Sequence, residues 1–382
     1  MPELPEVQTI VDDLNKKVRG CRITGVWFDW PKTIGIVFAD RRGLLRGSTQ
    51  KSKQFKKILE KIIKGKEILG VRRRAKNILI YLQDTDQYGL NRDLRGHKKI
   101  PYKSVFSPFK SASHVMLIHL KMTGHLLVGK WSIRKAQPSP ARRARGTRKR
   151  PHEYKDVVVP LEPKEAVEDP YNQYVHLIFY LDPVRSRPPQ GGRSHSPKAR
   201  AASNGVDNWK MLAFSDLRKF GKVILGTKEQ IENLPELKKL GPEPLDKSFK
   251  FIKFVKLIKS EKRKIKQVLM DQEVIAGIGN IYSDDILWMA KIHPFKPANK
   301  LSERELKELW KAMRQILTKA LKLRGTSISD YRDTAGKEGE YTEERLVYQR
   351  EGEPCQRCKT KIKRVKIGGR SAHFCPACQR LN

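Results

Sequence analysis

The apolar positions near the start of the chain repeat at helical spacing, and mostly polar residues fill the intervals between them. The apolar positions are Val7, Ile10, Val11, Leu14 and Val18. Side chains three or four residues apart lie on one face of an α-helix. The pattern therefore predicts an amphipathic helix over residues 5–18.

Short runs rich in β-branched and aromatic residues follow this helix. They alternate with polar residues or form brief apolar blocks, and turn residues separate them. The runs are ITGVWF, GIVF, ILGVRRR, NILIYL, HVMLIHL, YVHLIFYL, MLAFSD and KVILG. A series of this kind predicts an antiparallel β-sandwich or barrel.

From about residue 229 the apolar pattern turns helical. The runs are KEQIENLPELKKL, FKFIKFVKLIKSEKRKIKQVLMD, NIYSDDILWMAKI and SERELKELWKAMRQILTKALKL. A β-rich first part followed by a helical second part implies separate domains. We expect an α+β multidomain protein, with an antiparallel β-sandwich domain at 1–228, a helical domain at 229–348 and a small C-terminal domain at 349–382.

Two stretches interrupt the β-rich part. Residues 130–150 carry nine basic residues and no acidic one, and residues 183–207 are rich in Pro, Ser, Gly and Arg. Such composition is typical of solvated segments without a packed core. Both stretches are therefore interpreted as insertions into the β-rich domain.

The charge balance narrows the class of partner. The 382 residues include 80 Lys and Arg against 41 Asp and Glu, a formal net charge of +39. A surplus of this size favours a polyanion, either nucleic acid or an anionic membrane face. No apolar run reaches the roughly 18 residues of a membrane span, and the start has no apolar signal region. We therefore expect a soluble, intracellular protein.

Four of the five cysteines have metal-ligand spacing. Cys355-x2-Cys358 is followed by sixteen residues and then by Cys375-x2-Cys378, which predicts one structural zinc ion held by four thiolates. The alternative is four free or disulfide-linked cysteines. The segment RVKIGGRSAHF between the pairs predicts a β-hairpin. The fifth cysteine, Cys21, is expected to be a small buried side chain at the start of a strand.

The segment GIGNIYSDDIL at 277–287 is a second candidate site. Glycines followed by Asn at a helix start offer backbone N–H groups to a phosphate. Such turns also occur without a ligand, but this one lies between two amphipathic helices of a very basic chain. The sequence therefore favours DNA backbone as the anion.

Eight short segments along the chain form an ordered set. They are PELPEV at the start, RRRAKNIL (72–79), HLKMTG (119–124), SDLRKFG (215–221), MDQEVIAGIGNIYSDDIL (270–287), GTSISDY (325–331), EGEY (338–341) and the four-cysteine segment. Together they resemble the bacterial formamidopyrimidine-DNA glycosylases, bifunctional enzymes that remove 8-oxoguanine and ring-opened purines. The resemblance implies an N-terminal β-sandwich, a helix–two-turn–helix domain and a zinc finger, with damaged double-stranded DNA in the cleft between the lobes.

The first residues carry the chemistry that this resemblance implies. Pro2, once Met1 is removed, presents a secondary amine that can form a Schiff base at C1′ of the damaged nucleotide. An α-amino group has a pKa near ~7.7–8.0, below the ~10.4 of lysine, so it is the better nucleophile at neutral pH. Glu3 is the implied proton shuttle, and Glu6, one helical turn on, is implied to lie near the flipped base. The alternative is an ordinary helix start, where Pro and acidic residues are favoured.

The resemblance also implies residues that hold the DNA backbone. Lys76 matches a lysine that contacts the phosphate flanking the lesion and assists elimination. Lys266 and Asn280 match phosphate contacts of the helical domain. Arg370, in the predicted hairpin, matches an arginine that holds the phosphates of the lesion through its planar fork. Tyr341 is implied to contact the base site.

Three residues match the intercalating set of the family. They are Met122 in HLKMTG, and Arg218 and Phe220 in SDLRKFG. When the damaged nucleotide leaves the stack, an apolar wedge and an aromatic ring offset the lost stacking, and an arginine reads the orphaned cytosine. The alternative for Met122 and Phe220 is ordinary core packing.

The chain departs from the family pattern in two respects. Ser329 stands where many relatives carry a basic residue, in the loop that covers the flipped base, so a capping contact there is in doubt. The larger departures are insertions near 85–113, 130–172 and 183–208. The basic ones are expected either to add nonspecific DNA affinity or to be solvated loops without a role.

Three other functions compete with a purine-specific glycosylase and lyase. An endonuclease VIII-like enzyme for oxidised pyrimidines would begin PEGPE, whereas this chain has Leu4. A non-enzymatic zinc-finger DNA-binding protein has no need of Pro2 and Glu3, and an RNA-binding zinc-ribbon protein leaves PELPE unexplained. We therefore expect a monomeric base-excision-repair enzyme with one structural Zn²⁺, acting on damaged DNA in the bacterial cytoplasm.

Overall fold

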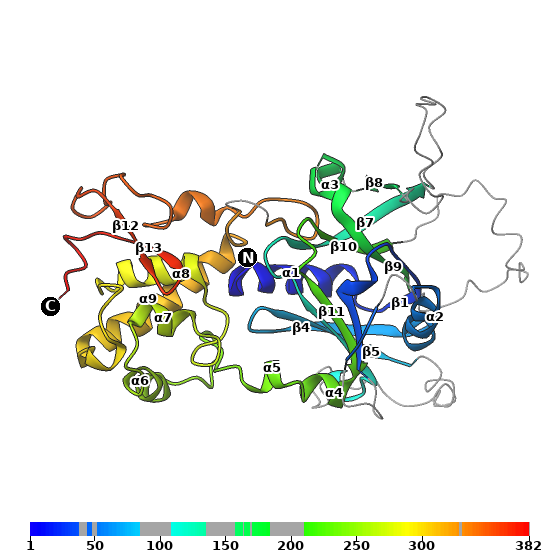
Figure 1. Ribbon diagram of the computed structural model, residues 1–382, viewed down its shortest axis with the longest axis horizontal. Helices are drawn as coiled ribbons and strands as arrows, with labels where there is room; N and C mark the ends of the chain where they lie inside the picture. The colour runs from blue at the N-terminus through cyan, green and yellow to red at the C-terminus, as the bar shows by residue number, and fades with distance from the viewer. Residues whose placement is uncertain are drawn as a thin grey trace, which may run out of the picture.

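The computed structural model describes residues 1–37, 44–47, 52–84, 108–134, 157–162, 164–168, 170–183, 210–327 and 331–381. Ser329 and most of the three predicted insertions lie outside these residues. Figure 1 shows a sheet lobe and a helical lobe, with helix α1 (Leu4–Lys17) starting between them. The helix predicted over residues 5–18 is therefore confirmed.

The sheet lobe contains eleven strands among the described residues. In hydrogen-bonded order they are β3 (Leu44–Arg46), β2 (Ile34–Val37), β11 (Lys222–Thr227), β6 (His114–His119), β5 (Asn77–Gln83), β4 (Glu67–Arg74), β1 (Cys21–Phe28), β9 (Val175–Pro183), β10 (Lys210–Asp216), β7 (Gly124–Arg134) and β8 (Val157–Glu162). Neighbours are antiparallel except β11 and β2, which run parallel. Each run of sequence predicted as a strand overlaps one of these elements.

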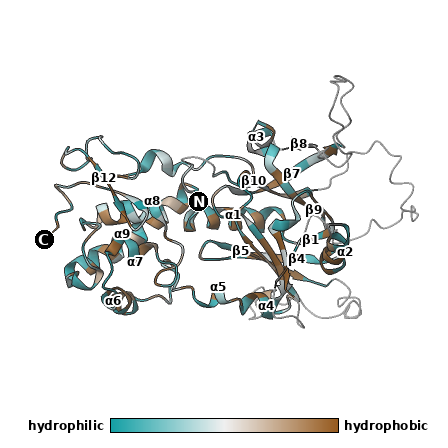
Figure 2. Cartoon of the chain, in the orientation of Figure 1, coloured by the Kyte–Doolittle hydropathy of each residue, from teal (hydrophilic) through white to brown (hydrophobic). Residues whose placement is uncertain are grey.

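The two ends of this strand order share one apolar core. Residues of β2 and β11 pack in the same cluster as residues of β9 and β10, and α1 contributes its apolar face to it. Figure 2 shows hydrophobic residues concentrated along these strands. A core enclosed by strands from both ends of the order is the expected sandwich arrangement, and it fixes α1 in place.

No prediction covers helix α2 (Ser52–Ile63), which also packs on this core. Its buried residues Phe55, Leu59 and Ile63 lie four positions apart, so the helical period is present in the sequence. The lysines between them make the segment look like a charged loop. A short helix, α3 (Lys164–Glu168), follows β8.

Six α-helices follow β11 among the described residues. Two short ones, α4 (Lys228–Glu232) and α5 (Pro235–Lys238), pack through Ile231 and Leu237 on strands of the sheet lobe. The helical lobe is built from α6 (Phe251–Lys259), α7 (Ile265–Met270), α8 (Asn280–Met289) and α9 (Glu303–Lys322). Single 3₁₀ turns are η1 (Pro31–Thr33), η3 (Pro108–Lys110), η5 (Pro170–Tyr174), η7 (Ala298–Lys300) and η8 (Tyr341–Glu344).

Two predicted helical runs are each split in two. In the run 228–240 the break falls before Pro235, which has no backbone N–H and starts a new helix. In the run 249–271 the chain turns at Ser260, and the Ile265 N–H donates to the carbonyl of Lys296 instead of continuing α6. The partner of Ile265 is distant in sequence, so the local pattern does not reveal this break.

The C-terminal domain is a hairpin docked on the end of α8. Strands β12 (Lys363–Ile367) and β13 (Arg370–Phe374) flank Gly368 and Gly369, whose φ angles are +52° and +77°. A left-handed pair at the tip favours glycine, and the predicted hairpin is confirmed. Arg357 donates to the carbonyls of Trp288 and Met289 at 2.7 and 3.0 Å, so this domain caps the C-terminus of α8.

Candidate active site

Glu3 lies at the junction of the two lobes. It immediately precedes α1 and is 2% exposed. Its carboxylate accepts hydrogen bonds from the backbone N–H groups of Gly279 (2.6 Å) and Ile281 (2.9 Å), at the start of α8. A Cβ atom at Gly279 would overlap this carboxylate, so only glycine permits the approach. The anion-binding turn predicted from GIGN therefore binds an internal carboxylate in this structure.

Glu6 lies one turn further along α1 and is 1% exposed. One oxygen accepts from the Tyr282 hydroxyl and from the Thr326 N–H (2.8 Å), and the other from the Glu3 N–H (2.8 Å). Burial raises the pKa of Glu6 and the Glu3 charge raises it further, while these hydrogen bonds oppose the rise. Two carboxyl groups in different environments are thus held on one helix turn.

Lys76 lies in the turn between β4 and β5 and is 5% exposed. Burial lowers the pKa of its ammonium, the charges of Glu3 and Glu6 partly restore it, and Arg370 lowers it again. These electrostatic interactions show that Lys76, the two glutamates and Arg370 share one region. The turn is held by Glu243, which accepts a hydrogen bond from the Ala75 N–H at 2.6 Å.

A small cavity of about 30 Å³ opens beside these groups. The residues that line it are Met1, Pro2, Glu6, Met122, His125, Ile281, Thr326 and Tyr331. Both lobes contribute to the lining, and the predicted amine of Pro2 shares the cavity with Glu6. Met1 and Met122 also border a larger cavity of about 930 Å³, whose lining includes Lys32, Arg46, Lys121, Lys219 and Lys222.

The three predicted intercalating residues lie on two neighbouring loops. Phe220 is 59% exposed, Arg218 is exposed and Met122 is half-buried, so core packing does not explain Phe220. Asp216 ties the loops together: it accepts from the Thr123 hydroxyl (2.5 Å) and from the Gly221 N–H (2.6 Å). The loops are thus a rigid platform that presents Phe220 to solvent.

Lys266 does not lie on the surface. Its side chain is 0% exposed, and its ammonium donates to the carboxylate of Asp284 on α8. Asp284 also accepts from the N–H (2.9 Å) and Nδ1 (3.1 Å) of His373 on β13. The predicted phosphate contact of Lys266 would require this lysine to be uncovered; in this structure it joins α7 to α8. Asn280, the first residue of α8, keeps a buried Oδ1 without a hydrogen-bond partner among the described residues.

Tyr341 is also fully buried. Its hydroxyl donates to Asp285 at 2.9 Å, and its ring packs edge-on against Tyr282 at 5.3 Å between centroids. Burial raises the pKa of Asp285 to about 6. Since Tyr282 in turn bonds Glu6, Tyr341 lies behind the cavity wall, and its predicted contact with the base would be indirect.

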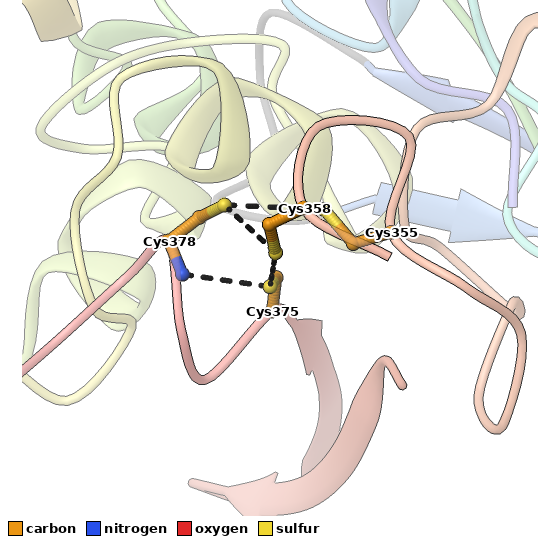
Figure 3. A group of neighbouring side chains, drawn as sticks. All are labelled: Cys355, Cys358, Cys375 and Cys378. Carbon is orange, nitrogen blue, oxygen red and sulfur yellow. Dashed lines mark hydrogen bonds between the residues drawn. The ribbon is translucent and has the colours of Figure 1, made fainter. Parts of the chain in front are cut away.

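The four predicted zinc ligands gather at one point. Figure 3 shows the sulfurs of Cys355, Cys358, Cys375 and Cys378 facing one another, and all lie within 4.8 Å. A tetrahedral zinc site puts sulfurs about 3.8 Å apart, from Zn–S bonds near ~2.3 Å. The sulfur of Cys358 lies 3.4 Å from that of Cys375 and from that of Cys378, and Cys355 lies 4.0 Å from Cys378. The spacing fits one structural zinc ion, and Cys21 is buried apart from it, as predicted.

Sequence patterns did not single out several residues around the cavity. Tyr282 and Tyr331 lie inside quoted segments, and His125 directly follows one. Their roles depend on Glu6 and Pro2, which are distant in the sequence. The only local signal is that these polar aromatic residues stand in otherwise apolar or glycine-rich runs.

Family models match all three parts of the chain. Residues 1–223 match the N-terminal domain of formamidopyrimidine-DNA glycosylase, residues 240–332 match its H2TH domain, and residues 352–381 match the zinc finger found in FPG and IleRS. No helix in the described part of the chain is both long and apolar enough to cross a lipid bilayer.

Curated relatives align along the whole chain. A protein of Desulforamulus reducens named formamidopyrimidine-DNA glycosylase is 32% identical, over 100% of this chain and 99% of its own. One of Pelotomaculum thermopropionicum with the same name is 31% identical, over 100% of both chains.

Solved structures agree with these alignments. The Lactococcus lactis Fpg in complex with DNA containing an abasic site has a TM-score of 0.64 and 26% identity, and covers 99% of this chain and 100% of that one. The same enzyme with DNA containing N7-benzyl-Fapy-dG has a TM-score of 0.65 at the same identity, over 100% of both chains.

Proposed function

Because the chain belongs to the formamidopyrimidine-DNA glycosylase family, we propose that it removes oxidised purines from duplex DNA through a Schiff base on Pro2. It is a base-excision-repair glycosylase and abasic-site lyase. The observation that carries the mechanism is the position of Pro2 in a cavity with Glu6, directly before the carboxylate of Glu3.

The reaction begins with the amine of Pro2, after removal of Met1. Its nitrogen bonds to C1′ of the damaged nucleotide, and the bond from C1′ to the base breaks, with the electron pair leaving on the base. The sugar ring opens as Glu3 passes the proton of the Pro2 nitrogen to O4′, and an iminium remains at C1′. Loss of a proton from C2′ then drives β-elimination of the 3′ phosphate, and loss of a proton from C4′ drives δ-elimination of the 5′ phosphate. Water then hydrolyses the iminium and releases the sugar fragment from Pro2.

The protein supplies fixed charges around this sugar. Lys76 contacts the flanking phosphate and assists elimination, and burial lowers the pKa of its ammonium, which makes it a better proton donor than an exposed lysine. Arg370, exposed at the start of β13, holds the phosphates on the opposite side. Asn280, at the start of α8, would contact a phosphate through its amide NH₂ group. Lys266 and Tyr341 support this surface from within.

The extruded nucleotide leaves a gap that the two loops fill. Phe220 enters beside the gap, Met122 occupies it, and Arg218 contacts the orphaned cytosine. The basic residues along the larger cavity extend the positive surface beyond the loops. The zinc ion is structural: it holds the β12–β13 hairpin that carries Arg370, and takes no part in bond breaking.

The partner is damaged double-stranded DNA, bound by one copy of the chain in the bacterial cytoplasm, at the nucleoid. We divide the chain into a catalytic domain at 1–228, a helix–two-turn–helix domain at 229–348 and a zinc finger at 349–382. Every domain contributes to the DNA-facing surface described above.

The test is strand cutting of an 8-oxoguanine:cytosine duplex in the presence of borohydride. We expect cleavage without the reductant and a covalent protein–DNA adduct with it. Mass spectrometry should place the adduct on Pro2 in protein that has lost Met1. An adduct on a lysine, or full activity in protein that retains Met1, would refute the mechanism.

A further inference from the structure

A residue of α1 and two residues near the end of the helical lobe meet at a charged cluster two helical turns beyond Glu6. Arg324, just after α9, donates through one nitrogen to Asp13 on α1 and to Asp333, both at 2.6 Å. The side chains of Asp13 and Asp333 are 9% and 4% exposed. Two buried carboxylates that share one nitrogen lie close together, so the guanidinium is what makes their approach favourable.

Thr334, the residue after Asp333 in the same segment, adds further hydrogen bonds to the cluster. The Thr334 hydroxyl bonds Asp13 at 3.2 Å and accepts from the ammonium of Lys17 at 2.7 Å. The carbonyl of Thr334 accepts from the Val128 N–H at 2.9 Å, which fixes the same segment to β7. Figure 1 shows this segment, in orange, reaching from the helical lobe toward β7 and β10.

Arg324 thereby holds two described parts of the chain that line the small cavity, at Thr326 and at Tyr331. On one side Gly325 and Thr326 follow it directly; a Cβ at Gly325 would overlap the Glu6 carboxylate, and Thr326 donates to that carboxylate at 2.8 Å. On the other side Tyr331, two residues before Asp333, lines the same cavity. The backbone packs so closely on Glu6 that a small displacement of the wall would move the cavity lining.

We propose that Arg324 is a positioning residue for recognition of the damaged base. Its two ion pairs fix Thr326 and Tyr331 against Glu6 and so set the shape of the protein wall beside Pro2 that the damaged nucleotide meets. The inference rests on the function proposed above. The hydrogen bonds of Arg324 among the described residues go to Asp13 and Asp333 and not to Pro2 or Glu3, so we expect its loss to affect the holding of the base more than the chemistry at the sugar.

This separation defines the experiment, because the enzyme also cleaves a preformed abasic site, where no base has to be held. In Arg324→Ala the single-turnover rate of 8-oxoguanine excision should fall about tenfold or more, the scale of a sub-ångström misplacement. Strand cleavage at a preformed abasic site should stay within about twofold of the wild type. Zinc content and the unfolding temperature establish that the variant is folded.

Two further variants keep the test decisive. Lys322→Ala removes an exposed charge from the last turn of α9 and should leave both rates unchanged. Arg324→Gln keeps much of the length of the side chain without its charge, and should show the same loss confined to the base-containing substrate, even if Arg324→Ala does not fold. Equal losses on both substrates, or no loss on either, would overturn the proposal. A wild type inactive on both would instead refute the proposed function.

Discussion

Glu3 is the single residue whose replacement tests the chemistry most directly. Its two oxygens each face a backbone donor, from Gly279 and from Ile281. In Glu3→Gln one of these donors would meet an NH₂ group, and no proton could be shuttled. We expect the single-turnover rate of 8-oxoguanine excision to fall by about 10²–10⁴.

The matched control for this prediction is Asp12→Asn, an exposed acid on the same helix. It should excise 8-oxoguanine at the wild-type rate. If Glu3→Gln retained a rate within about threefold of the wild type, Glu3 would not be the proton shuttle.

Asp285 provides a prediction about pH. Its folded-state pKa of about 6 lies above the ~3.9 of an unfolded aspartate, so the folded protein binds more protons between these values. The stability contributed by this group is therefore lost as pH rises toward 6 and above. From pH 5 to pH 7.5 its contribution should fall by about 1 kcal/mol.

The measurement compares the unfolding free energy of the wild type with that of Asp285→Asn across this pH range, with zinc in excess. The amide can still accept from the Val347 N–H and meet the Tyr341 hydroxyl, but it does not ionise. The difference between the two proteins should shift in favour of the variant as pH rises. A difference independent of pH would show that Asp285 does not titrate in this range.

Candidate site residues that stand close together in one sequence motif could be predicted from the sequence. Pro2, Glu3 and Glu6 fall within six positions of one another, and the structure brings them to one cavity region. Sequence reasoning did not foresee that Lys266 and Tyr341 are buried. Their burial is set by Asp284 and Asp285 on α8, contacts that no local pattern encodes.

Among the elements, the β12–β13 hairpin depends most on a bound ion. Its apolar cluster is small, and two of its buried members are the ligands Cys355 and Cys375. We expect one zinc ion per chain by metal analysis. Removing it with a chelator should abolish DNA binding, because Arg370 loses its support, while the separate core of the sheet lobe persists.

Binding of duplex DNA by fluorescence anisotropy, with circular dichroism to follow the sheet lobe, checks this prediction. Cys21→Ser is the control: Cys21 is buried in β1 and should not affect zinc content. Unchanged DNA affinity after complete removal of zinc would contradict the role assigned to the hairpin.

Elements with an uninterrupted apolar period were predictable, whereas those defined by distant partners were not. The eight predicted strands and α1 follow their apolar pattern, whereas β7, whose Leu126 and Val128 also reach the core, was not predicted. The separation of α6 from α7 depends on the backbone hydrogen bond from Ile265 to Lys296. Helix α2 was not predicted because lysines stand between its buried residues Phe55 and Leu59. Tertiary contacts override local propensity at these places.

For the molecule as a whole, a further prediction concerns the contribution of the basic stretch at 130–150 to DNA affinity. Residues 130–134 belong to β7, so a deletion should be confined to 135–150, which lies outside the described residues. Since dispersed cations contact phosphates and read no bases, affinity for damaged and undamaged DNA should fall by similar factors. The single-turnover rate at saturation should stay unchanged.

Titrations at several salt concentrations check this prediction. The salt dependence should become shallower by about 0.9 in slope for each phosphate that the deleted cations had neutralised. A deletion that kept both affinity and slope but slowed the saturated chemical step would refute it, and would mean that the stretch helps to build the lesion site.

The order of the β-rich and helical domains could be predicted from the change in apolar period. The contact between the two lobes at the site could not. Glu3 stands in the first domain and its donors Gly279 and Ile281 stand in the second. Figure 1 shows α1 beginning at this junction. These partners are far apart in the sequence, so no local sequence pattern could reveal that they meet.

That junction constrains how such a gene can be inherited. A recombination event that transferred only residues 1–223 would carry Pro2, Glu3 and Lys76 but leave the Glu3 carboxylate without its two backbone donors. The recipient would gain the catalytic side chains without the contacts that hold Glu3 in place. The two lobes therefore have to be inherited together for the site to work, because neither domain alone holds all of its groups.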